Sequence, residues 1–134
     1  MNILIIDAQG GGIGRQLVAA IKGNIADAVV TAVGTNTVAT SAMLKAGADY
    51  GATGENAVVV NSRRADVIVG PVGIVIADAL LGEITPAMAK AVAQSRGKRI
   101  LIPINHCDNI AVGVSDLNIG KLIQEVVAEL SKFS

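Results

Sequence analysis

Short apolar runs alternate with longer segments of helical spacing along this chain. Four runs, residues 3–6, 29–33, 67–69 and 100–104, have the length of buried strands. Between the first two runs, Ile13, Leu17, Val18 and Ile21 recur at the spacing of one helix face, and Gly23 is suited to the left-handed residue that ends a helix. Strands separated by helices are typical of a parallel sheet.

The other helices are predicted from spacing and from capping residues. They span about residues 38–46, 55–64, 74–81, 86–96 and 119–130. Thr85 and Pro86 are typical of an N-cap and of the first helical position. Residues 58–60 are three valines that could also pair as a strand, but a helix is favoured there because successive parallel strands need a crossover. Residues 110–114 are predicted to form a fifth strand at an edge of the sheet.

The composition fits this architecture. Hydrophobic residues make up 51% of the 134 residues and charged residues only 16%, so the chain has enough apolar content to fold. Only 1% are aromatic, so aliphatic side chains must build the core, as in parallel strands covered on both faces. We therefore predict one α/β domain over residues 1–134, a Rossmann-like three-layer sandwich with a mainly parallel sheet of four to five strands.

Charge and cysteine content argue against several classes of function. Eleven basic and eleven acidic residues cancel, and no basic cluster exceeds two residues, so neither nucleic acid nor a membrane is an expected partner. Cys107 is the only cysteine, which excludes an internal disulfide and fits a reducing cytoplasm. The first seven residues lack the pattern of a signal peptide or membrane span. With so little net charge to keep surfaces apart, we expect a homo-oligomer.

The most informative segment is the glycine-rich turn Asp-Ala-Gln-Gly-Gly-Gly-Ile-Gly-Arg at residues 7–15, which follows a predicted strand and opens a predicted helix. Glycines allow a sharp turn and expose N–H groups at the positive end of the helix dipole, where a phosphate binds well. Arg15 could add a charge-assisted hydrogen bond. Asp7 opposes this, since its carboxylate repels an anion unless a metal, a ribose hydroxyl or a proton intervenes. The alternative is that the glycines serve only close packing of strand and helix.

This turn resembles two known glycine loops. Gly12-Ile13-Gly14 looks like the end of the short-chain dehydrogenase motif, but Ala8 stands where that motif begins with glycine. The second predicted strand also lacks the terminal acidic residue that holds a ribose hydroxyl, so NAD(P) stays an open but unfavoured alternative. Residues 11–14 are similar to the phosphate loop of the partition ATPases, but Arg15 replaces the expected lysine, which argues against NTP hydrolysis.

Polar and glycine residues also follow the other predicted strands. Ligands of open parallel sheets bind beyond the carboxyl ends of the strands, so these residues are expected to share one crevice. The alternative is that polar residues simply gather where strands meet loops. The predicted ligand-contacting residues are Asp7, Gly10, Gly11, Gly12, Ile13, Gly14, Arg15, Thr35, Asn36, Gly70, Pro71, Gly73, Asn105 and His106.

Three further residues are chemically distinctive. His106 and Cys107 are neighbours, and neighbours on an extended chain point to opposite sides, which disfavours a catalytic pair. A packing role is expected for Cys107, while His106 is a general base, a ligand contact or a satisfied loop residue. Asp78, on a mostly apolar stretch, is expected to act as a cap or to form a salt bridge with Arg63 or Arg64. No residue is assigned to a metal or to catalysis.

Four segments carry a resemblance that extends over the whole chain: residues 7–14, 65–71 (Ala-Asp-Val-Ile-Val-Gly-Pro), 82–87 (Gly-Glu-Ile-Thr-Pro-Ala) and 102–105 (Ile-Pro-Ile-Asn). They are similar to a family of short bacterial proteins catalogued as a domain of unknown function, which supports the fold and implies no activity.

Three hypotheses for the function remain. The first is a regulatory or sensory module that binds a nucleotide or another phosphate-bearing metabolite at the glycine turn. The second is a small enzyme using the same crevice, with Asp7, Asn36, Asn105 and His106 as its polar groups. The third is an oligomeric interaction protein whose turn is vestigial.

Overall fold

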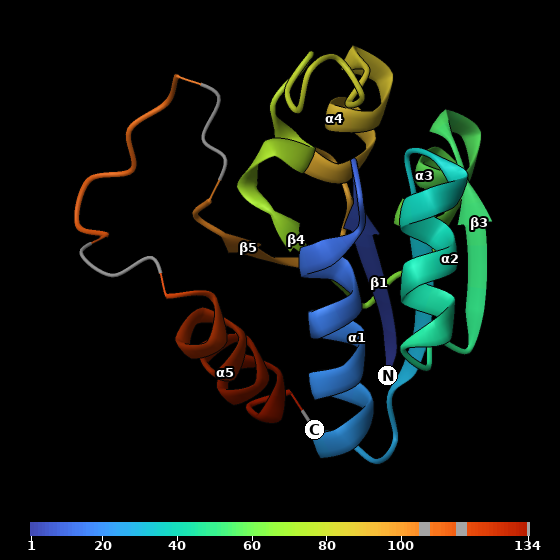
Figure 1. Cartoon of the computed structure of the whole chain (residues 1–134), viewed down its shortest axis with the longest axis vertical. Coiled ribbons are helices and arrows are strands. Elements are labelled where there is room, and N and C mark those ends of the chain that lie inside the picture. Colours follow the sequence, from blue (N-terminus) through green and yellow to red (C-terminus); the bar gives the residue numbers. More distant parts are fainter. Residues whose placement is uncertain (105–107, 115–117, 134) are drawn as a thin grey trace.

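The computed structural model describes residues 1–104, 108–114 and 118–133 (Figure 1). Its centre is a five-stranded sheet in which every pairing is parallel and the strand order is β3-β2-β1-β4-β5. The strands are β1 (Asn2–Asp7), β2 (Val29–Gly34), β3 (Tyr50–Thr53), β4 (Val67–Pro71) and β5 (Lys98–Ile102). The predicted α/β class and parallel sheet are confirmed.

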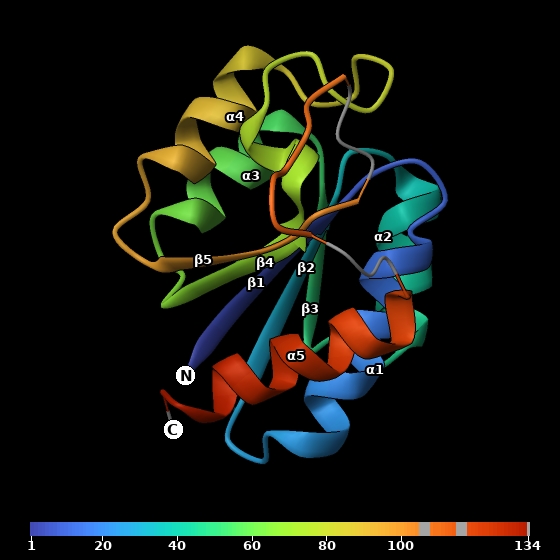
Figure 2. The ribbon, with the colours of Figure 1, turned by 90° about the vertical axis from the view of Figure 1, so that its left-hand side faces the viewer.

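Helices cover both faces of the sheet (Figures 1 and 2). One layer holds α1 (Gly12–Asn24), α2 (Thr37–Lys45) and α5 (Ile119–Ser131), and the other holds α3 (Glu55–Ser62), α4 (Pro86–Ala93) and the short 3-10 helix η1 (Val72–Val75). Among the described residues, no helix is both long enough and apolar enough to cross a membrane.

The sheet separates two hydrophobic cores, because successive side chains of a strand point to opposite faces. In β1, Ile3 and Ile5 pack with α1 and α5, whereas Leu4 and Ile6 pack on the side of α3 and α4. All four are almost fully buried. This two-sided burial explains why β1 reads as a continuous apolar run in the sequence.

The strand order places β1 at the point where the topology reverses. From β1 the chain moves outward to β2 and β3, then returns through α3 to β4 on the other side of β1. The loops that follow β1 and β4 therefore leave toward opposite faces of the sheet. In sheets of this kind, ligands bind in the crevice that forms between such loops.

Two predictions for the outer strands of the sheet are wrong. The fifth strand is β3, which pairs with β2, whereas residues 110–114 form no strand and expose Ile110 (91%) and Val112 (96%) to solvent. The segment Tyr-Gly-Ala-Thr of β3 has no apolar run, since an edge strand buries little of its surface. The last strand also begins earlier than expected, at Lys98, and ends at Ile102.

Two helices end at other residues than predicted. The helix α1 continues through Gly23 to Asn24, whose side chain donates to the Ala20 carbonyl at 2.7 Å, and Gly23 is not left-handed. The helix α4 has its predicted N-cap, Thr85, but ends at Ala93, three residues early. The helix α3 is confirmed over Glu55–Ser62.

The predicted helix over residues 74–81 is wrong. After η1 the chain runs through a series of turns, with Asp78 (φ 65°), Leu80 (φ 58°) and Leu81 (φ 60°) in the left-handed region, which an α-helix does not allow. The N–H of Asp78 donates to the Ile84 carbonyl at 2.7 Å, so the turns close on themselves. Asp78 is exposed and, within the described residues, forms no salt bridge with Arg63 or Arg64, contrary to expectation.

Candidate functional site

The loop between β1 and α1 borders a small pocket at the carboxyl edge of the sheet. The pocket has a volume of about 240 Å³ and is lined by Asp7, Ala8, Gln9, Gly10, Gly12, Ile13, Gln16, Leu80 and Ile119. Most of these residues come from the glycine-rich turn itself. Leu80, from the turns after η1, and Ile119, the first residue of α5, add an apolar wall.

Two glycines of the turn are required by packing. Gly11 is left-handed (φ 72°), and a Cβ there would lie 2.8 Å from the Cα of Ala39 on α2. A Cβ on Gly14 would lie 2.5 Å from the Met43 sulfur and 2.8 Å from the Asp7 Cβ. Real Cβ atoms do not approach other atoms so closely, so any larger residue at either position forces the turn away from its neighbours.

The other two glycines have no such requirement. A Cβ on Gly10 or on Gly12 would meet no atom within 4 Å, and neither residue has a positive φ. Both are exposed, and within the described residues neither N–H has an acceptor. The packing alternative therefore explains Gly11 and Gly14 but leaves Gly10 and Gly12 unexplained.

Asp7 ends β1 and is only 5% exposed. Its Oδ2 accepts the Gly14 N–H at 2.6 Å and its Oδ1 accepts the Ala8 N–H at 2.8 Å, so its carboxylate lies on the N-terminus of α1. Burial is the largest influence on Asp7 and raises its pKa above the ordinary value, although backbone N–H groups of Gly14, Ala8 and Ile13 act in the opposite direction and Glu83 adds repulsion. The conflict expected between Asp7 and a bound anion therefore remains, because the surroundings already disfavour the charged carboxylate and a nearby anion would disfavour it further.

Glu83, which the sequence analysis missed, does not line the small pocket but contacts the glycine-rich turn beside it. It lies in the connection between β4 and α4, and its Oε1 accepts three hydrogen bonds: from the Gln9 N–H at 3.1 Å, the Thr35 hydroxyl at 2.7 Å and the Asn36 side-chain amide at 2.8 Å. Partial burial is the largest influence on Glu83 and raises its pKa, but the hydrogen bonds together outweigh it, so the pKa lies below its ordinary value. Its position in a connection at the carboxyl edge was the available signal.

Thr35 and Asn36 do meet the glycine turn, as predicted. Asn36 caps α2 by accepting the Ala39 N–H at 2.9 Å, and its amide also donates to the Gln9 carbonyl at 2.9 Å. Together with Glu83, these residues join the connections that follow β1, β2 and β4. Three strand ends therefore converge on one place.

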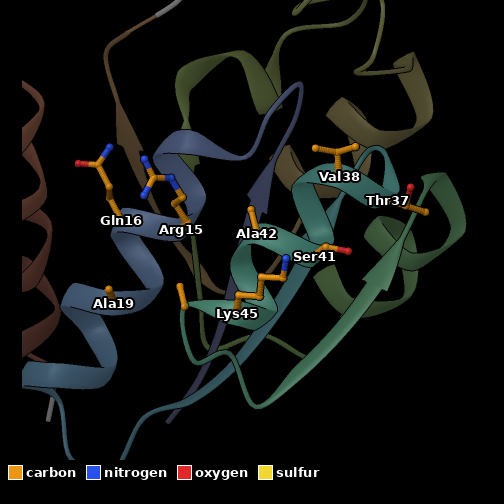
Figure 3. A pocket seen from close by; sticks show the side chains of 9 residues that line it. Arg15, Gln16, Ala19, Thr37, Val38, Ser41, Ala42 and Lys45 are labelled. Atoms are coloured by element: carbon orange, nitrogen blue, oxygen red, sulfur yellow. The ribbon is translucent and has the colours of Figure 1, made fainter.

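Arg15 lies outside the small pocket, on the wall of a larger groove between α1 and α2 (Figure 3). The groove has a volume of about 690 Å³ and is lined by Arg15, Gln16, Ala19, Thr37, Val38, Ser41, Ala42, Lys45 and Ala46. Figure 3 shows Arg15 beside Gln16 on α1, and Ser41 and Lys45 on the neighbouring helix α2. The guanidinium is exposed, one turn from the open N–H of Gly12.

The structure does not bring every predicted residue to the pocket. Gly70, Pro71 and Gly73 are buried, and a Cβ on Gly70 would lie 2.5 Å from the Ile6 carbonyl oxygen, so packing within the sheet accounts for that glycine. Asn105, His106 and Cys107 lie outside the described residues. In the part that is described, no group of three or more His, Cys, Asp or Glu side chains could hold a metal.

The arrangement combines donors for an anion with an acceptor for hydroxyl groups. The open N–H groups of Gly10 and Gly12 can donate to a phosphate, and the carboxylate of Glu83 can accept from a ligand hydroxyl. Asp7 is the only titratable side chain that lines the small pocket, and the described residues place no nucleophile with a base there.

Comparison with known proteins places the chain in a family without a described activity. No curated protein matches it. Among solved structures, it aligns with a dodecameric FMN-dependent Ubix-like decarboxylase from Escherichia coli O157:H7, with 17% identity, a TM-score of 0.47, and coverage of 96% of this chain and 76% of that chain. The sequence matches a family described as a domain of unknown function (DUF3842) over residues 2–134, which confirms the resemblance noted in the sequence, and the chain belongs to this family.

Proposed function

We propose that this protein binds a nucleotide, or another phosphate-bearing small metabolite, with its phosphate on the N–H groups of Gly10 and Gly12. The observation that carries the proposal is the open space around these two glycines, which no packing requirement explains. A residue without a side chain lets a ligand approach the backbone closely. The N–H of Gly12 lies at the first residue of α1, where the helix dipole favours negative charge.

Asp7 makes this binding dependent on pH. A phosphate on Gly12 adds negative charge beside a carboxylate whose pKa is already raised by burial, so the bound state favours the protonated form of Asp7. Binding should therefore be accompanied by proton uptake. The affinity for phosphate is expected to rise as the pH falls toward the pKa of Asp7, as long as the phosphate keeps its charge.

The test is a calorimetric titration of the purified chain with inorganic pyrophosphate and with ribonucleoside 5′-phosphates. Gly12→Asp places a carboxylate where the phosphate would lie, and the Cβ has room there. We expect this variant to remain folded and to lose about tenfold or more in affinity, the scale of one charge-assisted hydrogen bond. Gly23→Asp is the matched control, since Gly23 is also open and lies near the other end of α1.

Two results would contradict the proposal. A folded Gly12→Asp variant with unchanged affinity would place the ligand elsewhere. A wild-type chain that binds none of these compounds would favour the alternative of an interaction protein with a vestigial turn.

We also propose that the protein self-associates through the edge of β3. Within the described part of the chain this strand pairs only with β2, and its four residues carry no charge. Apolar side chains are exposed around it, with Tyr50 at 64% and Leu44 at 43%. An uncharged open edge pairs readily with another strand, and a second copy related by twofold symmetry offers the same edge.

A further inference from the structure

We propose that Glu83 binds the ribose hydroxyls of the ligand, so that the site selects a ribonucleotide among phosphate-bearing compounds. This inference rests on the proposed function and names the substrate class for the same site. It follows from the position of the Glu83 carboxylate at the carboxyl end of β2, beside the glycine turn.

The second predicted strand ends without the acidic residue that holds a ribose hydroxyl, which made NAD(P) an unfavoured alternative. The structure places a carboxylate at that end from another connection. Glu83 lies between β4 and α4, yet its Oε1 is 2.7 Å from the Thr35 hydroxyl and 2.8 Å from the Asn36 amide, the two residues that directly follow β2. The connection between β4 and α4 therefore supplies the carboxylate that the end of β2 lacks.

The carboxylate is held in one orientation and keeps one oxygen available. The three hydrogen bonds that the Glu83 carboxylate accepts all go to Oε1, and within the described residues Oε2 accepts none. The lowered pKa of Glu83 keeps it ionised near neutral pH, so Oε2 is an acceptor and not a donor. Two neighbouring hydroxyls of a ribose supply the donors that such an oxygen lacks.

The Glu83 carboxylate also adjoins the segment proposed to bind phosphate. It accepts the N–H of Gln9, and Gly10, whose open N–H is proposed to bind phosphate, is the next residue. The proposed hydroxyl acceptor and the proposed phosphate donor therefore lie on the same turn.

The turn that carries Glu83 has an unusual backbone. Asp78, Leu80 and Leu81 are left-handed although none is glycine, and Leu80 is nevertheless buried against the small pocket. Residues with large side chains rarely adopt this conformation, and such residues cluster where the surrounding structure fixes a functional group. Glu83 directly follows these turns, and its N–H donates to the Leu80 carbonyl at 3.2 Å.

The experiment compares each ribonucleoside 5′-monophosphate with its 2′,3′-dideoxy counterpart by calorimetric titration of the full chain. A site that bonds to a hydroxyl discriminates strongly against the analogue that lacks it, so we expect the preferred ribonucleotide to bind about tenfold or more tightly than its dideoxy form. In Glu83→Gln the remaining carbonyl oxygen can still accept from the three donors, and the preference should fall to about threefold or less.

Glu55→Gln is the matched control. Glu55 also accepts a threonine hydroxyl, that of Thr85 at 2.6 Å, but it lies at the start of α3 and takes no part in the site. Its substitution should leave the preference for ribose unchanged. The comparison in the wild-type chain needs no variant, so the inference can be tested even if Glu83→Gln does not fold.

The outcomes separate this inference from the proposed function. If pyrophosphate binding is sensitive to Gly12→Asp but ribose and dideoxyribose forms bind equally, phosphate binding stands and the role of Glu83 is wrong. If Glu83→Gln keeps the full preference for the ribonucleotide over its dideoxy form, another group binds the hydroxyls, which also overturns the inference. If no phosphate compound binds, both proposals fail.

Discussion

At the scale of single residues, the glycines of the turn divide into a packing pair and an open pair. We expect Gly14→Ala to lower the free energy of unfolding by about 1–3 kcal/mol, because its Cβ would overlap Met43 and Asp7. Gly12→Ala, at the first residue of the same helix, should be neutral or stabilising by up to about 1 kcal/mol. Urea denaturation of the two variants measures the difference. Equal effects would show that the distinction between the pairs has no energetic basis.

Asp7 and Glu83 are expected to give opposite dependences of stability on pH. The folded protein holds the Asp7 proton more tightly than the unfolded chain, so the contribution of Asp7 to the free energy of unfolding decreases as the pH rises from 3.8 to its raised folded pKa. The pKa of Glu83 is lowered, so its contribution is present above 4.5 and is lost as the pH falls through the folded pKa.

Unfolding of the wild type, Asp7→Asn and Glu83→Gln in urea at several pH values between about 3 and 7 tests these signs. The stability of the wild type relative to Asp7→Asn should fall as the pH rises over this range, and its stability relative to Glu83→Gln should increase. Two slopes of the same sign would mean that one of the two pKa shifts has the wrong direction.

At the scale of elements, strands buried on both faces and helices with one apolar face were predictable, because both patterns follow from burial. The edge strand β3 was not, since its exposed positions impose no pattern on Tyr-Gly-Ala-Thr. Residues 74–81 failed for another reason. Ile74, Ala79 and Leu80 are buried as expected, but they reach the core through left-handed turns that apolar composition does not reveal.

The N-cap of α4 is a predicted element boundary whose energy can be measured. The Thr85 hydroxyl accepts the Met88 N–H at 3.2 Å and donates to Glu55 at 2.6 Å, so one side chain caps α4 and links it to α3. We expect Thr85→Ala to destabilise the protein by about 1–2 kcal/mol and Thr85→Ser, which keeps the hydroxyl, to cost much less. Thermal or urea unfolding distinguishes them. A serine variant as unstable as the alanine variant would assign the effect to the lost methyl group.

At the scale of the whole molecule, the location of the candidate site was predictable but its main acidic residue was not. Parallel topology alone directs Asp7, Thr35 and Asn36 to one edge, and the structure joins them there. Glu83 is 48 residues from Thr35 along the chain, and only the tertiary fold brings the two together. Sequence patterns report local spacing, whereas a contact across three connections depends on how all of them fold.

The two edges of the sheet differ in a way that predicts how copies associate. At one edge, β5 begins with Lys98 and Arg99, and such charges oppose pairing with another strand. At the other edge, β3 has no charge and exposes Tyr50.

We therefore expect the wild-type chain to form dimers at micromolar concentration and Tyr50→Lys to shift them to monomers, as measured by sedimentation velocity. Leu81→Lys is the control, because Leu81 is 96% exposed but lies far from β3 in the chain, in the connection to α4. If Leu81→Lys dissociates the dimer and Tyr50→Lys does not, the copies meet near the candidate site and not at the sheet edge. A wild-type chain that sediments only as a monomer would contradict self-association altogether.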